Sequence, residues 1–141
     1  MNTANIVFTS DLKRAIDSAK FLKPSVKIIS NPIFRETEIP IPFSKLLLGL
    51  KLHSSIWAVI LRFLWFCGYS NGCESLKDAK RRAEKASKFL AANANEHKNV
   101  VLVGHGFFNM LIGKELKKMG WKGKKKVNTT HWHATIFFLD A

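Results

Sequence analysis

Short apolar strands that run directly into turns and helices constrain the fold of this chain more than any other feature. Apolar, β-branched residues predict strands over 4–8, 26–29, 99–104 and 134–139. Helical patterns separate these strands, and strands that alternate with helices tend to pair in parallel. The sequence therefore predicts an α/β fold, a three-layer sandwich around a mostly parallel central sheet.

Three segments between the strands carry apolar residues at helical spacing. The first has Thr9 or Ser10 as its predicted N-cap. The second begins with Ser75 and Asp78 at the spacing of a capping box. The third follows the strand at 99–104. We expect these helices to supply the outer layers of the sandwich.

The length and the apolar content favour one domain. The chain has 141 residues, of which 47% are hydrophobic, and this suffices for a substantial core. Within a single domain over 1–141 we expect 43–72, which is dense in large apolar residues, to form an insert or cap. Lys51, His53 and Arg62 interrupt this stretch, so we expect no membrane span. A buried helix and a lipid-facing or partner-facing surface both fit its composition.

The charge of the chain indicates anionic partners. It carries 23 Lys and Arg against 10 Asp and Glu, a formal net charge of +13. Such a field attracts phosphorylated small molecules, inorganic phosphate and nucleic acid. The lysine-rich tract at 117–126, a predicted solvated loop, contains Trp121 as a stacking group. Nucleic-acid binding is the weakest of the alternatives, because no nucleic-acid-binding motif accompanies the tract.

The cysteines indicate a reducing compartment. Cys67 and Cys73 are the only two, and free thiols fit them better than a disulfide framework does. No histidine lies at zinc-ligand spacing from them, so we expect no metal and no other cofactor. The first residues lack the pattern of a secretion signal, and we therefore expect a cytoplasmic protein.

Residues that can do chemistry follow two of the predicted strands. Ser10 and Arg14 follow the first strand, and His105 and Gly106 follow the third. Ligands of parallel sheets bind outside the carboxyl ends of the strands, so we expect these residues to face one crevice. A guanidinium offers paired donors to phosphate, an imidazole donates or carries a proton, and glycine admits close backbone approach.

Each of these residues also has an ordinary structural explanation. An arginine in the first turn of a helix, such as Arg14, is commonly a solvated side chain. Glu36, which lies in a proline-rich segment, fits a loop carboxylate without a catalytic role. A histidine between two glycines after a strand points more strongly to function.

Taken in order, four short motifs resemble those of the histidine phosphatase superfamily, the phosphoglycerate-mutase-like proteins. The resemblance extends across essentially the whole chain. The motifs stand here as Thr9-Ser10-Asp11-Leu12-Lys13-Arg14-Ala15 with Ser18-Ala19, Phe34-Arg35-Glu36, Cys73-Glu74-Ser75-Leu76 with Arg82 in the following helix, and Val100-Val101-Leu102-Val103-Gly104-His105-Gly106.

The resemblance implies a phosphomonoester phosphatase that works through a phosphohistidine. In such enzymes a nucleophilic histidine takes the phosphoryl group, while two arginines and a second histidine stabilise its charge. A carboxylic acid protonates the leaving oxygen. The resemblance makes Arg14 the second arginine, His105 the second histidine and Glu36 the acid, with Ser10, Arg14, His105 and Gly106 around the phosphate. Mutase activity is less favoured, because nothing indicates a site for a second phosphorylated species.

The chain departs from the family in one respect. The family's nucleophile and first arginine belong to an Arg-His-Gly at the end of its first strand, and no Arg-His-Gly occurs here. We therefore expect the first strand to be missing, which leaves half of an active site and a chain with little or no activity. A degenerate module that binds a phosphorylated ligand is the alternative.

The missing strand has a consequence for the sheet. In the family it lies beside the strand that ends at His105. Without it, we expect that strand to present an exposed edge, unless the last strand closes the gap. An exposed edge would favour self-association.

Overall fold

The computed structural model describes residues 6–22, 25–40, 49, 52–124, 127, 129–130 and 132–140. It divides the chain into two compact units. One comprises Thr37–Arg81, and the other comprises Met1–Glu36 together with Arg82–Ala141. The insert predicted at 43–72 falls within the first of these units, and part of it lies outside the described residues. Its role as a cap stays a prediction.

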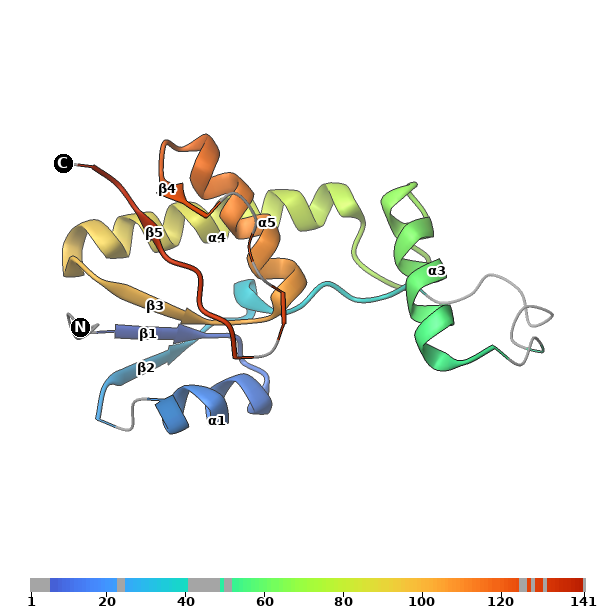
Figure 1. Ribbon diagram of the computed structural model, residues 1–141, viewed down its shortest axis with the longest axis horizontal. Coiled ribbons are helices and arrows are strands. Elements are labelled where there is room, and N and C mark those ends of the chain that lie inside the picture. Colours follow the sequence, from blue (N-terminus) through green and yellow to red (C-terminus); the bar gives the residue numbers. More distant parts are fainter. Residues whose placement is uncertain are drawn as a thin grey trace. The chain divides into compact units, whose positions relative to one another are not determined.

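A parallel sheet forms the centre of the larger unit (Figure 1). Its strands are β1 (Ile6–Thr9), β2 (Lys27–Ser30) and β3 (Val100–Val103), in the order β2-β1-β3. Ile6 is in register with Lys27 on one side and with Val100 on the other, and both pairings are parallel. Every residue of the central strand β1 is buried. The predicted α/β fold with a parallel sheet is confirmed.

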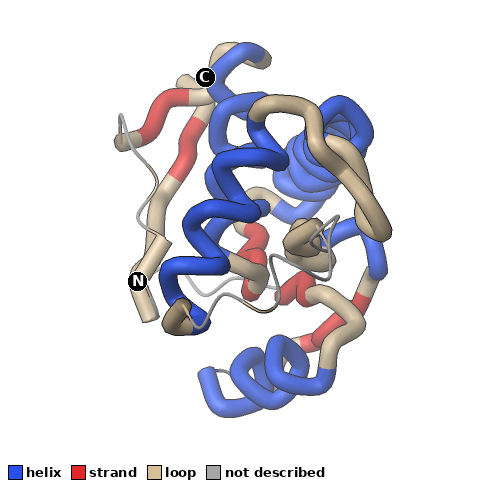
Figure 2. The backbone as a smooth tube through the Cα atoms, turned by 90° about the vertical axis from the view of Figure 1, so that its right-hand side faces the viewer, coloured by secondary structure: helices blue, strands red, loops and turns tan. Residues whose placement is uncertain are grey.

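Helices cover both faces of this sheet. Helix α1 (Lys13–Leu22) lies on one face, while α5 (Gly106–Lys118) and the part of α4 (Leu76–His97) from Arg82 onward lie on the other (Figures 1 and 2). Small side chains permit close approach, and Ala15, Ala19, Ala83 and Ala86 are at most 3% exposed. The three layers follow from this arrangement.

Three aromatic rings form the centre of the core in the larger unit. The ring of Phe8 lies 5.1 Å from that of Phe89 and 6.2 Å from that of Phe34, measured between centroids. Tilted and edge-on rings at these separations add attraction beyond the burial of their area. The contact joins β1, α4 and the 3₁₀ turn η1 (Pro32–Phe34).

Capping side chains begin two of the elements, of which the sequence predicts one, and the predicted cap of a third helix is absent. The Ser75 hydroxyl accepts from the Asp78 amide at 3.1 Å, which is the first bond of the expected capping box. The Asp78 carboxylate accepts from the Ser75 hydroxyl at 2.8 Å. Asn31 caps η1 through its side-chain oxygen. The prediction that Thr9 or Ser10 caps α1 is wrong. That helix begins at Lys13, and the Leu12 carbonyl accepts its first backbone hydrogen bonds.

The region after α5 differs from the prediction of a solvated loop at 117–126. Helix α5 continues to Lys118, and a short strand β4 (Lys122–Gly123) pairs antiparallel with β5 (Phe137–Phe138). Lys125 and Lys126 lie outside the described residues. The strand expected at 134–139 is shorter, and it pairs with β4 instead of β3. In the described part of the chain β3 therefore stands at the edge of its sheet.

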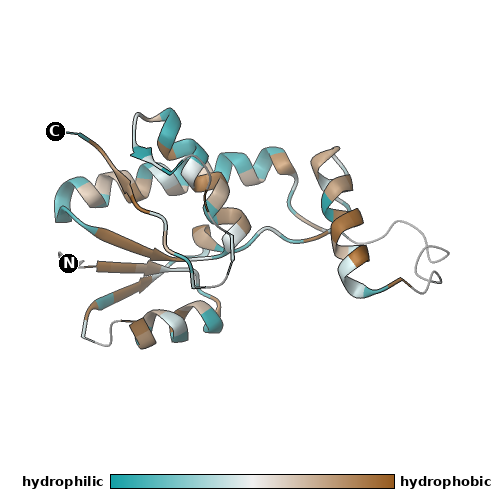
Figure 3. Cartoon of the chain, in the orientation of Figure 1, coloured by the Kyte–Doolittle hydropathy of each residue, from teal (hydrophilic) through white to brown (hydrophobic). Residues whose placement is uncertain are grey.

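The smaller unit is built around α3 (Ser54–Phe66). Leu61 and Trp65 are buried, and the Trp65 indole donates to the Glu74 carbonyl at 2.7 Å. Arg62 lies over the Trp65 ring, 5.1 Å from its centroid, and donates to the Thr37 hydroxyl at 2.9 Å. Most of the helix is apolar (Figure 3), and its exposed large side chains are Ile56, Val59, Ile60, Phe63 and Phe66. Among the described residues, no helix has the length and apolar content needed to span a membrane.

Candidate functional site

The carboxyl ends of β1 and β3 bring Ser10 and His105 together. Thr9 and Val103 are in register at the ends of the two strands, so the residues that follow leave the sheet at the same edge. There the Ser10 hydroxyl and His105 Nε2 form a hydrogen bond of 2.8 Å. Both residues are buried. The convergence of the two turns, which the strand–turn–helix pattern predicts, is thus present.

The surroundings of His105 favour its neutral form. Burial lowers the pKa of His105 below its ordinary value. The carboxylate of Glu36 opposes this shift and the guanidinium of Arg14 adds to it. The structure therefore places Arg14 and Glu36 close enough to His105 for both charges to influence the imidazole. The second ring nitrogen of His105, Nδ1, has no hydrogen-bond partner among the described residues.

Glu36 is held at the first turn of α5. Its carboxylate oxygens accept from the backbone amides of Phe107 at 3.3 Å and Phe108 at 3.0 Å. The amides of a helix's first turn have no acceptor within the helix, and together with the positive end of the helix dipole they attract a carboxylate to this position. Because α5 begins immediately after His105, these bonds keep the carboxyl group beside the imidazole.

Arg14 leaves the second position of α1 and is exposed. Its guanidinium makes no hydrogen bond or ion pair within the part of the chain that the structure describes. Its backbone carbonyl accepts from the Ser18 hydroxyl at 2.8 Å. The paired donors of Arg14 are therefore available to an anion near His105.

The glycines on either side of His105 are packed against protein atoms. A Cβ at Gly104 would lie 2.5 Å from Asn109 Oδ1, and one at Gly106 would lie 2.5 Å from the Thr129 carbonyl oxygen. Each position thus has a steric reason for glycine that involves no ligand. The amide of Gly106 has no acceptor among the described residues, which leaves one donor at the start of α5.

Two arginines that occur in the quoted motifs, but to which no role was assigned, organise the segment carrying Glu36. Arg35 forms a two-point ion pair with Asp11, in which its Nε lies 2.6 Å from Asp11 Oδ1. This hydrogen bonding lowers the pKa of the Asp11 carboxyl. Arg82 donates to the carbonyls of Ile33 at 2.9 Å and Arg35 at 2.7 Å. The sequence signal for these residues is their place in the motifs, in which Asp11 and Arg35 directly adjoin Ser10 and Glu36, but the motifs do not indicate the contacts.

The arrangement suits an oxyanion of about the size of phosphate. The Arg14 guanidinium, the His105 imidazole and the Gly106 amide can donate to its oxygens, and Ser10 fixes the imidazole. The carboxyl group of Glu36 can exchange a proton with a group bound beside it. Phosphate, with several oxygens to be satisfied at once, is the ligand that this combination of charge and donors best fits.

Comparison with known protein families gives one match, which covers nearly the whole chain. The family model described as histidine phosphatase superfamily (branch 1) matches residues 2–138. Searches of curated proteins and of solved structures gave no significant match.

Proposed function

Since the chain belongs to the histidine phosphatase superfamily, we propose that it forms the phosphate-binding half of a phosphomonoester phosphatase. The observation that carries the proposal is the 2.8 Å bond between Ser10 and His105, with the charges of Arg14 and Glu36 both acting on that imidazole. The free thiols of Cys67 and Cys73 support a reducing, cytoplasmic compartment.

In the complete enzyme the reaction runs in two displacements. A histidine nitrogen supplied by an Arg-His-Gly segment attacks phosphorus and the P–O bond to the leaving group breaks, while the Glu36 carboxyl gives its proton to the leaving oxygen. Water then attacks the phosphohistidine, the N–P bond breaks, and the Glu36 carboxylate takes the proton of that water. Arg14, His105 and the Gly106 amide stabilise the charge on the phosphoryl oxygens through both steps.

Residues 1–141 contain no Arg-His-Gly, so we propose that these residues alone bind phosphate without turning over a phosphomonoester. A module that only binds a phosphorylated ligand is the second candidate. The guanidinium of Arg14, which has no partner among the described residues, favours it, because this group can hold an anion whether or not a nucleophile is present. A nucleic-acid role, which would rest on net charge alone, ranks third.

The proposal is tested by phosphate binding in a pair of variants. Wild type, Arg14→Ala and Lys13→Ala are titrated with inorganic phosphate and with vanadate, and hydrolysis of an aryl phosphate is followed in parallel. Lys13→Ala is the matched control, because it removes the same charge from the adjacent exposed position of α1. A charged hydrogen bond contributes about 1.5–3 kcal/mol, so we expect Arg14→Ala to weaken binding by roughly 10-fold to 100-fold.

Two results would contradict the proposal. Equal affinities of Arg14→Ala and Lys13→Ala would show that phosphate is attracted by the general field and not by this site. Turnover that disappears in His105→Ala would show that the 141 residues are an active enzyme without the Arg-His-Gly segment.

A further inference from the structure

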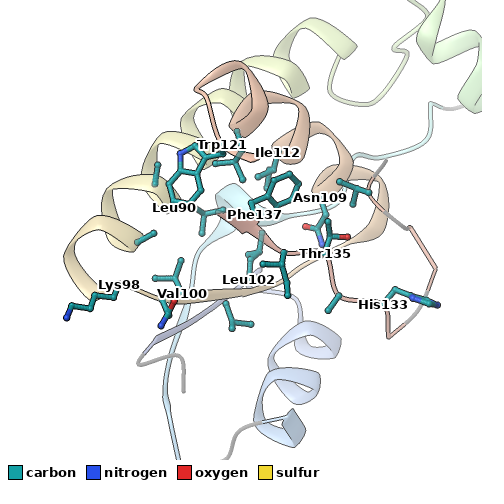
Figure 4. Close-up of a pocket in the computed structure, with 18 residues that line it drawn as sticks. Leu90, Lys98, Val100, Leu102, Asn109, Ile112, Trp121, His133, Thr135 and Phe137 are labelled. Carbon is teal, nitrogen blue, oxygen red and sulfur yellow. The ribbon is translucent and has the colours of Figure 1, made fainter. Parts of the chain in front are cut away.

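The cavity of about 370 Å³ beside β3 has an explanation in the family fold. Leu90, Val100 and Phe137 contribute to its wall (Figure 4), and β3 is the edge strand of its sheet in the described part of the chain. Because the family has a further strand beside the one that ends at His105, the cavity points to no new ligand. The exposed apolar face of α3 (Ser54–Phe66), in the smaller unit, has no such explanation.

The exposed large side chains of α3 lie on one side of the helix. Val59 and Phe63 are 69% and 67% exposed, whereas Leu61 and Trp65, on the opposite side, are buried. Positions three and four apart share one side of a helix, so the exposed side chains form one continuous row. We call this row the α3 stripe, and its members are Ile56, Val59, Ile60, Phe63 and Phe66.

No acidic residue accompanies the α3 stripe in the sequence. Residues 39–73 contain no Asp or Glu, whereas they contain Lys45, Lys51 and Arg62. The whole chain has the same sign, with a formal net charge of +13. The stripe therefore belongs to an apolar segment that anionic surfaces attract and cationic surfaces repel.

These charges distinguish between the partners that an exposed apolar face can have, which are a membrane and another protein. A second copy of this chain would bring two acid-free segments together, and like charges oppose such a contact. An acidic protein would need basic groups on the helix with which to pair, but the only charged residue of α3 is Arg62. Arg62 is directed toward its own unit, since it donates to the Thr37 hydroxyl at 2.9 Å and lies over the Trp65 ring.

An anionic lipid surface requires no such pairing. Apolar side chains of a surface helix enter the boundary between headgroups and acyl chains, while basic residues of the same segment are attracted to the headgroups. We propose that the α3 stripe docks the protein on the surface of an anionic lipid bilayer. The docking uses no residue of the Ser10–His105 site and does not rest on the proposed function.

The length of α3 decides between lying on a bilayer and spanning it. Its 13 residues extend about 20 Å, which is less than the hydrocarbon core of about 30 Å. Helix α3 therefore lies along the membrane plane, with Val59 and Phe63 toward the lipid and Leu61 and Trp65 toward the protein.

Binding to vesicles tests the proposal on the full 141-residue chain. The protein is mixed with vesicles of phosphatidylcholine alone, or of phosphatidylcholine and phosphatidylserine in equal parts, and the bound fraction is measured by co-sedimentation. We expect binding to the mixed vesicles to be tighter by about tenfold or more, because several basic residues act together near an anionic surface.

Two phenylalanine substitutions locate the contact. Phe63→Ser interrupts the stripe, and Phe21→Ser is the matched control, because Phe21 is an 83% exposed phenylalanine of α1 in the larger unit. We expect Phe63→Ser to weaken binding to the mixed vesicles by about tenfold or more, since a phenyl ring is lost from the lipid, and Phe21→Ser to leave it unchanged. Urea unfolding of both variants, in which an exposed side chain is replaced, should give the wild-type midpoint.

A second pair of variants tests the role of charge. Val59→Lys and Val59→Glu lose the same exposed apolar side chain but differ in the sign of the charge that they introduce. We expect Val59→Glu to bind the mixed vesicles more weakly than Val59→Lys by about tenfold or more, because anionic headgroups repel a carboxylate. Equal affinities of these two variants would contradict docking on anionic lipid.

The outcomes separate the possible partners. Selective binding to the mixed vesicles that is weakened in Phe63→Ser and retained in Phe21→Ser supports the proposal. Absence of binding, equal binding to both kinds of vesicle, or equal losses in the two phenylalanine variants overturns it. So does a stable dimer without lipid that Phe63→Ser dissociates, because the stripe would then be an interface between copies. Phosphate affinity should equal that of wild type in all four variants, so a failure of docking and a failure of the phosphate site are observed separately.

Discussion

His105 combines burial with the influence of two opposite charges. The imidazole is buried and hydrogen-bonded to Ser10, yet a carboxylate and a guanidinium both act on it. Burial has the largest effect, and it lowers the pKa of His105 relative to an exposed histidine. Burial therefore favours the neutral imidazole, whereas a bound phosphate would favour the charged form and act against this shift.

This lowered pKa predicts how stability depends on pH. The ordinary value is 6.5, so as the pH falls through that value the unfolded chain binds a proton at His105 before the folded chain does. The contribution of His105 to the free energy of unfolding is therefore present above 6.5 and declines as the pH falls toward the lower folded value. We expect His105→Gln to remove this part of the decline, measured by denaturant unfolding between about pH 7 and pH 5. An identical pH dependence in the variant would mean that the pKa of His105 is the same in both states.

At the scale of the elements, contacts between residues that are distant in sequence hold the segment with Glu36 in place. Arg82 on α4 binds the carbonyls that precede Glu36, and its guanidinium lies 3.9 Å from the centroid of the Phe108 ring on α5. One side chain thus connects α4, the segment 33–35 and the start of α5. The carboxyl of Glu36 is positioned by this connection and by the amides of α5 together.

Substitution of two neighbouring arginines tests whether Arg82 holds these elements together. Arg82→Met removes charged hydrogen bonds and a ring contact, and we expect a loss of about 2–3 kcal/mol in the free energy of unfolding. Arg81→Met is the control. Arg81 pairs with Asp78 at 3.8 Å, both side chains are at least 60% exposed, and such pairs contribute less than about 1 kcal/mol. Urea unfolding of both variants measures the difference, and equal losses would show that Arg82 does not organise this segment.

The sequence predicts those elements whose signals are local. The capping signal at Ser75 lies within three residues of the start of α4, and the hydroxyl of Ser75 accepts from the Asp78 amide as predicted. The 3₁₀ turn that Asn31 caps was not predicted, although its signal is equally local. The start of α1 was missed because the Ser10 hydroxyl bonds to His105, 95 residues away, instead of capping the helix. Strand β4 was missed for a related reason, since two residues of a basic tract become a strand only through their pairing with β5.

In the candidate site, too, the sequence predicts what the backbone arrangement determines and misses what individual side-chain contacts determine. The turns after the two strands were predicted to face one crevice, because the ends of parallel strands converge whatever the side chains are. The turns do meet, and the hydrogen bond between Ser10 and His105, which was not predicted, joins them. The pairing of Arg35 with Asp11 and the bonds of Arg82 to the segment 33–35 were not predicted, because they depend on side-chain positions that no spacing encodes. The catalytic and phosphate-binding roles of Ser10, Arg14, Glu36, His105 and Gly106 stay predictions.

At the scale of the whole molecule, the excess of positive charge is the property most easily mistaken for a site. A net charge of +13 attracts any anion to the surface, including nucleic acid, without a specific contact. Attraction of this kind acts over the screening length of the solution, whereas a guanidinium that binds phosphate acts at hydrogen-bond distance. Salt therefore separates the two.

We expect the affinity of the wild type for phosphate to fall as salt rises from about 0.1 M to about 1 M, because the screening length shrinks from about 10 Å to about 3 Å. The ratio of affinities between wild type and Arg14→Ala should remain large at both concentrations, since direct contacts lie within the shorter length. The ratio between wild type and Lys13→Ala should approach one. Calorimetric titration at the two concentrations measures both ratios. A ratio for Arg14→Ala that also collapses to one at high salt would assign phosphate binding to the field of the whole molecule, and the site at His105 would then bind no phosphate of its own.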